Sequence, residues 1–177
     1  MSNKKLAINL GSGDKKIQST KEYRWINCDV AKECNPDMVV DLEKKLPFKD
    51  NSIDYIYSEH TFEHIRPEFW KQFLKELQRI AKPNCILELV LPFDNQRNRT
   101  CIDHYRTFSY GSWYINEYEA GHDGDRGYFG ELRLKMISKK PNKFYRIWIQ
   151  IFPFLCNEVY FKFEIVKNDE TLMKKET

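Results

Sequence analysis

A short apolar run that breaks into two glycines constrains this chain more than any other stretch. Residues 6–10 have the character of a buried strand, and Gly11-Ser12-Gly13 follows at once. This pattern is typical of a strand that ends in a tight turn facing a phosphate or a nucleotide. Glycine suits such a turn because the backbone takes unusual dihedral angles and no side chain separates it from a ligand. The motif needs support from downstream, because Gly-Xaa-Gly also occurs in ordinary turns.

Further apolar segments predict an α/β fold. Strands are expected over residues 24–29, 37–41, 53–57 and 85–91, and a helix over 67–81, where apolar residues recur at helical spacing. Only eleven residues, 14–24, separate Gly13 from Trp25, so the first connection is a short helix or a loop. Strands spaced in this way favour a parallel, doubly wound sheet.

The second half of the chain carries weaker patterns. We expect a polar loop over residues 94–105, a helix over 109–120, a strand over 131–137, an amphipathic helix over 143–152 and a closing strand over 159–166. The tail from residue 168 is charged, and we expect it to be frayed.

Composition excludes several classes of protein. The chain has 177 residues, enough for one domain, and 29 Lys and Arg are interspersed with 26 Asp and Glu, so no nucleic-acid-binding arm is implied. Five scattered cysteines without a Cys-Xaa-Xaa-Cys pair argue against a disulfide framework or a zinc knuckle, and favour a reduced, cytoplasmic protein. The start lacks the pattern of a signal peptide, and the most apolar later window, 147–156, is about half a membrane span, so we expect no stable membrane insertion.

Polar groups follow several of the predicted strands. In a parallel sheet, ligands bind outside the carboxyl ends of the strands, where we expect the glycine turn, Asp29, Asp41-Leu42, Ser58-Glu59-His60 and the loop after residue 92. Asp29 is placed to accept both hydroxyl hydrogens of a ribose; the alternative is a solvated or helix-capping carboxylate. Asp54 begins its strand, so it should lie at the opposite edge in a structural role.

An ordered series of motifs supports this interpretation. The series is Leu10-Gly11-Ser12-Gly13, Trp25-Ile26-Asn27-Cys28-Asp29, Asp41-Leu42, Leu46-Pro47-Phe48 with Asp50-Asn51-Ser52-Ile53-Asp54, Glu63-His64-Ile65 and Leu77-Gln78-Arg79-Ile80-Ala81-Lys82-Pro83. It resembles the successive motifs of the class I S-adenosylmethionine-dependent methyltransferases, most of all their small type 11 branch. The resemblance implies a three-layer, Rossmann-like fold with a mostly parallel sheet and an antiparallel last strand. It implies a single domain over 1–177, with a cofactor-binding half at 6–92 and an acceptor-side half at 93–177.

The resemblance also implies roles for individual residues. The turn Gly11-Ser12-Gly13 would pass under the methionine part of S-adenosylmethionine, Asp29 would hold the ribose, and Asp41 with Leu42 would contact the adenine. Ser58, Glu59 and His60 would form the floor beside the transferred methyl group.

Two positions depart from the pattern of the family. Lys15-Lys16 stands where a third glycine is common, which lowers the affinity expected for the cofactor. Pro83-Asn84-Cys85 replaces Pro-Gly-Gly, and asparagine tolerates the left-handed conformation that this turn needs.

Two histidines are candidate catalytic bases, since methyl transfer requires an aligned acceptor and sometimes removal of a proton. His60 follows a predicted strand, and His104 lies in the loop after the fifth strand. The alternative for each is a hydrogen-bonded residue that supports the fold or orients the acceptor.

The sequence His60-Thr61-Phe62-Glu63-His64 also matches a zinc-peptidase pattern. That chemistry needs both histidines on one helix face, whereas His60 directly follows a strand and Pro67 suits the first turn of the next helix. We therefore assign no metal ligands and expect Glu63 and His64 to hold the loop, with a divalent ion at Glu59, Glu63 and His64 as a minor alternative.

The functional hypothesis is transfer of a methyl group from S-adenosylmethionine to a small-molecule or glycan-type acceptor. Aromatic residues of the second half are candidates for covering the acceptor, or are simply core: Tyr105, Phe108, Tyr110, Trp113, Tyr114, Tyr118, Tyr128 and Phe129. One alternative is a non-catalytic, cofactor-binding interaction module of the same fold. Another is a nicotinamide-dependent oxidoreductase, which would have glycine in place of Lys16 and a fuller first helix.

Overall fold

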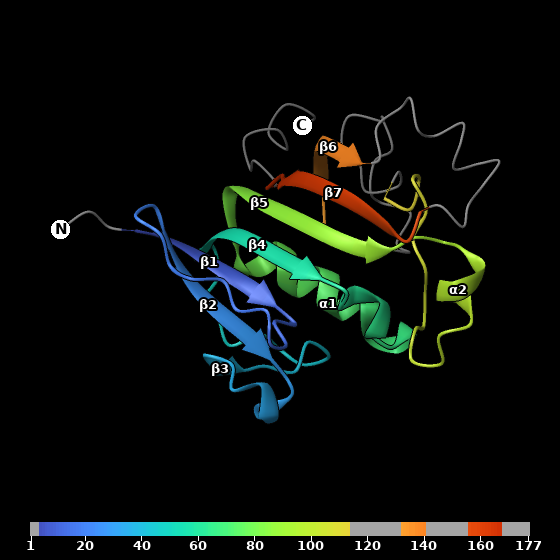
Figure 1. The fold of residues 1–177 in the computed structure, drawn as a ribbon. Coiled ribbons are helices and arrows are strands. Elements are labelled where there is room, and N and C mark those ends of the chain that lie inside the picture. The colour runs from blue at the N-terminus through green and yellow to red at the C-terminus, as the bar shows by residue number, and fades with distance from the viewer. Residues whose placement is uncertain (1–3, 114–131, 141–155, 168–177) are drawn as a thin grey trace, which may run out of the picture.

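A seven-stranded sheet organises the computed structural model, which describes residues 4–113, 132–140 and 156–167. Its order is β3-β2-β1-β4-β5-β7-β6 (Figure 1). The strands are β1 Lys5–Leu10, β2 Tyr23–Asp29, β3 Met38–Val39, β4 Ile53–Glu59, β5 Ala81–Pro92, β6 Leu134–Lys140 and β7 Glu158–Ile165. Strand β7 is antiparallel to both neighbours, and the other strand pairs are parallel. The predicted doubly wound sheet with an antiparallel last strand is confirmed.

The strand order places a crevice near the middle of the sheet. The chain starts at β1, moves outward to β3 and returns to β4 on the other side of β1. The connections that leave β1 and β4 therefore diverge, and the space between them at the carboxyl ends of the strands is where open α/β sheets bind ligands.

Helix α1 covers one face of this sheet (Figure 1). It spans Pro67–Ile80, close to the predicted 67–81, with Pro67 in its first turn. Five of the side chains predicted to share one face are buried: Trp70, Phe73, Leu74, Leu77 and Ile80. They pack into one core with the inward residues of β5 and β7, including Leu87, Leu89, Phe161 and Phe163.

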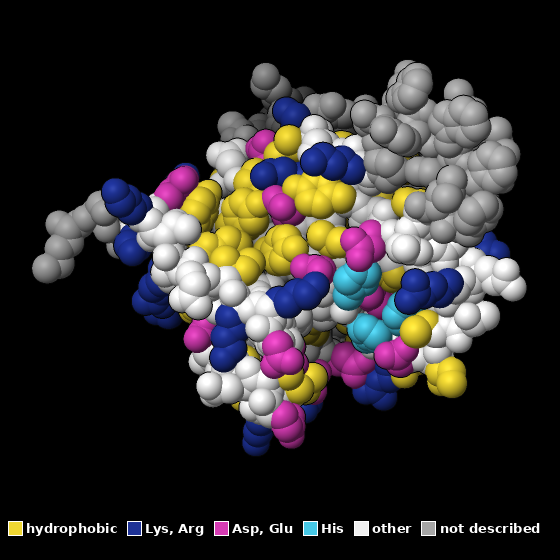
Figure 2. Space-filling model, viewed as in Figure 1, with side chains coloured by type: hydrophobic (Ala, Val, Ile, Leu, Met, Phe, Trp, Pro, Cys, Tyr) yellow, Lys and Arg dark blue, Asp and Glu magenta, His cyan; other side chains and the backbone are white. Residues whose placement is uncertain are grey.

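The opposite face of the sheet is half exposed. The side chains of β4, β5 and β7 alternate, so that residues such as Tyr55, Glu88, Tyr160 and Lys162 lie on this side and are only partly buried. In the same view, Figure 2 shows hydrophobic side chains over these strands with basic and acidic side chains among them. Alternation of this kind is typical of a sheet with one face packed and one face in contact with water.

Strand β5 begins four residues before the predicted start. Asn84 takes φ = 63°, the left-handed conformation that the sequence predicted for it. A register shift between Ile53 and Tyr55 lets Ala81 pair with Ile53 before the regular ladder resumes at Ile86. The turn after α1 is therefore built into the strand as a bulge.

Three predictions for the second half need correction. The segment 94–105 is not only a loop, because helix α2 forms at Gln96–Arg99, where the Asn95 side chain accepts a hydrogen bond from the Asn98 N–H. Residues 110–113 form a turn, and the strand predicted over 131–137 begins at Leu134. Helix α2 is too short to give a periodic apolar pattern, and only Leu134 is buried in the edge strand β6. The predicted helix at 143–152 and residues 114–120 lie outside the described residues.

A loop held by two asparagines replaces the first connecting helix, which is one of the two outcomes that the short spacing predicted. The Asn9 side chain donates to the Lys15 carbonyl (3.0 Å) and to Asn27 Oδ1 (3.1 Å). Asn27 Oδ1 also accepts from the Ile17 N–H (2.8 Å), and Asn27 Nδ2 donates to Asp37 (2.7 Å). Both asparagines are buried, so their amide groups hold the loop against the sheet in place of helix packing.

We expect Asn27→Ala to lower the free energy of unfolding by about 2 to 3 kcal/mol, because the buried Asn9 amide and the partly buried backbone groups of Ile17 lose hydrogen bonds. Urea denaturation of this variant measures the effect. Lys21→Ala, an exposed substitution in the same connection, serves as the control and should change stability by less than about 0.5 kcal/mol. A loss equal to that of the control would show that the asparagines do not hold the loop.

All five cysteines are free thiols, in agreement with the predicted absence of a disulfide framework. No helix in the described ranges is long and apolar enough to cross a membrane.

Candidate functional site

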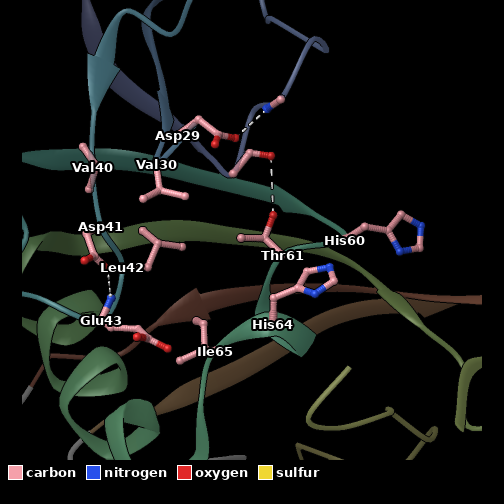
Figure 3. A pocket seen from close by; sticks show the side chains of 12 residues that line it. Asp29, Val30, Val40, Asp41, Leu42, Glu43, His60, Thr61, His64 and Ile65 are labelled. Atoms are coloured by element: carbon pink, nitrogen blue, oxygen red, sulfur yellow. Dashed lines mark hydrogen bonds between the residues drawn. The ribbon is translucent and has the colours of Figure 1, made fainter. Parts of the chain in front are cut away.

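A cavity of about 570 Å³ opens at the carboxyl ends of β1, β2 and β4 (Figure 3). Its size is typical of a site for a small molecule. It is lined by Gly11, Gly13, Asp29, Val30, Val40, Asp41, Leu42, Glu43, His60, Thr61, His64 and Ile65. Six of these were predicted site residues: Gly11, Gly13, Asp29, Asp41, Leu42 and His60.

The two glycines have different reasons to be glycine. Gly11 has φ = 67° and Gly13 has φ = 46°, so both lie in the left-handed region. A Cβ at Gly11 would lie 2.0 Å from Thr61 Oγ1, whereas a Cβ at Gly13 would meet nothing within 4 Å. The close contact with Thr61 therefore requires glycine at position 11, whereas the missing side chain of Gly13 leaves open space at the cavity.

Asp29 connects the glycine turn to the end of β2. Its Oδ2 accepts from the Gly13 N–H (2.7 Å), and its Oδ1 accepts from the Ala31 N–H (2.8 Å). Each carboxylate oxygen has a second lone pair. The residue thus holds the turn in place and still has acceptor capacity toward the cavity.

Apolar side chains form the wall beyond Asp29. Val30 follows it and is 64% exposed, while Val40 and Ile65 are buried. Figure 3 places Val30 and Val40 above Leu42, with Ile65 below. An exposed apolar side chain beside a carboxylate suits a ligand that has an apolar face and a hydroxyl-bearing part.

Two acids lie at the far end of this wall. Asp41 Oδ1 accepts from the Glu43 N–H (3.0 Å), and Lys44 pairs with Asp41 Oδ2 (3.1 Å). The Glu43 carboxylate is engaged by the Arg66 guanidinium, which holds the pKa of Glu43 below its usual value. Both acids therefore have fixed partners that set the shape of the loop after β3.

His60 follows β4 and has φ = 48°, an uncommon conformation for a residue with a side chain. Its Nδ1 lies 3.2 Å from Glu63 Oε1, and its Nε2 lies 2.8 Å from Glu158 Oε1. These two carboxylates raise the pKa of His60 to about 9. At neutral pH His60 is therefore an imidazolium that donates hydrogen bonds. In Figure 3 its ring points away from Val30 and Leu42.

Three predicted site residues lie behind the cavity instead of lining it. Ser12 is 4% exposed, and its N–H donates to the Cys28 carbonyl (3.0 Å). Ser58 is fully buried, and its hydroxyl donates to the Leu10 carbonyl (2.9 Å). Glu59 pairs with Lys15 and accepts from the Tyr57 hydroxyl (3.0 Å).

His104 also lies outside the cavity lining. Its ring meets the ring of His64 edge to face, with centroids 5.1 Å apart. The Tyr105 N–H donates to the Glu63 carbonyl (2.9 Å), which holds this loop against the turn η2, Phe62–His64. Glu59, which the sequence analysis grouped with Glu63 and His64 as an alternative ion site, forms an ion pair with Lys15 instead.

The zinc-peptidase arrangement is absent from the segment 60–64. His60 follows β4 and His64 ends η2, so the two histidines do not share a helix. The predicted structural role of Asp54 is confirmed. Its Oδ2 accepts from the Leu6 N–H (2.8 Å) and from Lys82 (2.7 Å), at the opposite edge of the sheet.

Sequence reasoning missed six residues that line the cavity. These are Val30, Val40, Glu43, Thr61, His64 and Ile65. Val30, Val40 and Glu43 could have been found from the sequence, because each lies within two residues of Asp29 or Asp41 at the end of a predicted strand. Thr61 could not have been found in that way, because only the packing against Gly11 identifies it.

The aromatic residues after β5 divide between core and surface. Phe108 and Trp113 are buried and stack with an interplanar angle of 4°, so they belong to the core. Tyr105 is 53% exposed and Tyr110 packs partly against the core. Tyr114, Tyr118, Tyr128 and Phe129 lie outside the described residues.

Comparison with known proteins agrees with this geometry. The sequence signature of the methyltransferase domain matches residues 21–89. The YcgJ protein of Bacillus subtilis has the same fold, with 16% identity and a TM-score of 0.61 over 94% of this chain and 93% of that one. A SAM-dependent methyltransferase from Methanosarcina mazei has 12% identity and a TM-score of 0.61 over 95% of each chain.

A third solved structure is the complex between the Haloferax volcanii Trm112 methyltransferase activator and a putative methyltransferase. It is similar at 17% identity and a TM-score of 0.57, over 92% of this chain and 83% of that one. No curated protein matches the sequence.

Proposed function

We propose that this chain is a class I S-adenosylmethionine-dependent methyltransferase of the type 11 branch and that it transfers the methyl group to a small-molecule or glycan-type acceptor. The observation that supports this most is the order of groups around one cavity. The glycine turn, the Asp29 carboxylate, an apolar wall and Asp41 follow one another there. These are the groups needed to receive a charged amino-acid end, a ribose and a flat base.

We assign the cofactor contacts from this order. Gly11 and Gly13 face the methionine part, and the open space at Gly13 provides the room. Asp29 accepts the ribose hydroxyls with the lone pairs that its backbone partners leave free. Asp41 and Leu42 lie toward the adenine, with Val30 as an added apolar contact. We propose that Ser12, Ser58 and Glu59 support these contacts from behind.

The bound cofactor supplies an activated methyl group on a sulfonium. The part left to the protein is to align an acceptor oxygen or nitrogen and to exclude water. We place the acceptor on the side of residues 93–177, where the loop after β5 meets η2. His60 and His104 are our candidates for taking up the acceptor proton, since one lines the cavity and the other contacts His64, which lines it. His60 would do so only in its neutral form, because an imidazolium has no lone pair to accept a proton.

Calorimetry with S-adenosylmethionine and S-adenosylhomocysteine, and NAD as the control ligand, tests the cofactor site. Release of S-adenosylhomocysteine in the presence of phenols, hydroxy acids, amines and oligosaccharides then tests transfer. Turnover on any of these classes supports the proposal and names the acceptor. Binding without turnover on all of them favours a non-catalytic module, and binding of NAD alone would overturn the proposal.

His60→Gln should lower kcat by at least about tenfold while changing cofactor affinity by less than about threefold. Glutamine keeps a hydrogen-bonding side chain but can neither hold nor pass on the proton. Single-turnover assays at saturating cofactor measure the effect, and His104→Gln is compared in the same assay. A change in melting temperature without a change in kcat would assign the residue to the scaffold.

A further inference from the structure

Three metal-binding side chains converge next to the cavity. One ligand atom each from Glu63, His64 and His104 lies within 4.8 Å of the other two. Glu63 and His64 come from η2, and His104 comes from the loop after β5. In Figure 2 the described histidines form one group, with acidic side chains around them.

Two polar atoms of this group are buried and lack a partner. Glu63 is 0% exposed, and its Oε2 has no hydrogen-bond partner in the described part of the chain. His104 Nδ1 is equally buried and equally without a partner there. The other oxygen, Glu63 Oε1, lies 3.2 Å from His60 Nδ1. A buried carboxylate with one oxygen unsatisfied is costly, so both orphan atoms require an explanation.

The third side chain, His64, has its Nδ1 engaged by a backbone carbonyl. His64 Nδ1 lies 3.0 Å from the Asp103 carbonyl oxygen. A carbonyl only accepts, so Nδ1 carries the proton of the neutral ring and the lone pair is on Nε2. Nε2 lies 4.0 Å from Glu63 Oε1, on the side of the group. Histidines that bind metals usually donate their other N–H to a carbonyl or a carboxylate in this way.

We propose that Glu63, His64 and His104 bind a divalent transition-metal ion, with Zn²⁺ as the reference ion. Two imidazole nitrogens and one carboxylate oxygen form a donor set that suits this class of ion. An ion bound through Glu63 Oε2 and His104 Nδ1 would satisfy both orphan atoms at once. Because His64 also lines the cavity, the remaining coordination positions would be available to an oxygen of a bound molecule. The site does not depend on methyl transfer, and it is tested separately.

A second donor set competes for one member of the group. Cys101, Asp103 and His104 also bring ligand atoms within 4.8 Å, but Cys101 and Asp103 are exposed. The triad with the fully buried carboxylate explains the orphan oxygen, and the exposed set does not. With an ion bound to Glu63, His64 and His104, the His104 lone pair is engaged, which leaves His60 as the candidate for managing the acceptor proton.

The test is calorimetric titration of the metal-free full chain with ZnCl2, together with the visible spectrum after addition of Co²⁺. We expect one ion per chain and a rise in melting temperature on zinc addition. His64→Gln and His104→Gln should each weaken zinc binding by at least about 30-fold, because each removes a ligand. Glu63→Gln is compared with them, and circular dichroism checks that each variant is folded.

Cys101→Ser is the matched control and should leave zinc affinity within about threefold of the parent chain. A loss in Cys101→Ser that equals the loss in His104→Gln would overturn the proposal in favour of the exposed set. Zinc binding unaffected by His64→Gln and His104→Gln would overturn it altogether. Cofactor binding is measured on the same samples, so failure of the metal site and failure of the methyltransferase site are distinguished.

Discussion

Gly11→Ala is expected to lower the free energy of unfolding by about 3 to 5 kcal/mol, whereas Gly13→Ala should cost only about 1 kcal/mol. Both residues have positive φ, so both substitutions share the backbone cost of a left-handed alanine. They differ in what the new methyl group meets. At Gly11 it would lie 2.0 Å from Thr61 Oγ1 and 2.4 Å from Thr61 Cγ2, and at Gly13 it would meet nothing within 4 Å.

Thr61 has little freedom to move away. Its hydroxyl lies 3.0 Å from the Glu59 carbonyl and 3.3 Å from the Leu10 carbonyl, at the junction of β4 and the turn that follows it. The clash therefore displaces the end of β4 or the turn itself, and both belong to the cavity.

Chemical denaturation measures the two glycine variants, and calorimetry with S-adenosylhomocysteine measures their affinity. Thr61→Gly in the Gly11→Ala background removes the atoms in the clash, so it should restore a large part of the lost stability. Gly13→Ala should stay folded and lose affinity, because its methyl group occupies space assigned to the cofactor. Equal stability losses for the two alanine variants would contradict the packing explanation.

Asp29→Ala should weaken binding of S-adenosylmethionine by about 100-fold, since it removes charge-assisted hydrogen bonds to the ribose. It also releases the Gly13 N–H, which now donates to Asp29 Oδ2 at 2.7 Å. Asp29→Asn separates the two effects. The amide oxygen can still accept one backbone hydrogen bond, so a large loss in this variant points to direct contact with the cofactor.

Asp54→Ala is the matched control for Asp29→Ala. Asp54 also accepts from a backbone N–H, that of Leu6, and pairs with Lys82, but it lies at the opposite edge of the sheet. Its loss should lower the melting temperature and leave cofactor affinity within about threefold of the parent chain. Unchanged affinity in Asp29→Ala would make Asp29 a purely structural residue and remove the main polar contact from the proposed site.

Strong local patterns predicted the first half of the chain well. Strands β1, β2 and β4 and helix α1 were found because each buries one continuous apolar run or stripe. The short spacing after β1 predicted a short helix or a loop, and the structure has the loop. The reason that the loop is stable was not visible, because it depends on Asn9 and Asn27, which come from two different strands and meet only in the sheet.

The second half was predicted less accurately because α2 is short and because β6 buries only Leu134. Helix α2 depends on one capping asparagine, which the prediction of a polar loop overlooked. Strand β7 was the exception, since its strict alternation from Val159 onward places Phe161 and Phe163 on the buried face. The alternation of a strand can be recognised in its own sequence, whereas the sequence of this loop did not reveal that Asn95 caps a helix.

By itself, the sequence determined which chemical groups stand at strand ends, because strand, turn and acid are adjacent along the chain. Tertiary structure alone decided which of them share a cavity. Ser58 and Glu59 are the last two residues of β4, and His60 follows them. Ser58 nevertheless points into the core and Glu59 pairs with Lys15, because successive side chains of a strand face opposite sides. The contact of His104 with Glu63 and His64 is likewise a product of folding. The two segments lie far apart in the sequence, on either side of α1 and β5, and come together only because the chain returns along β5.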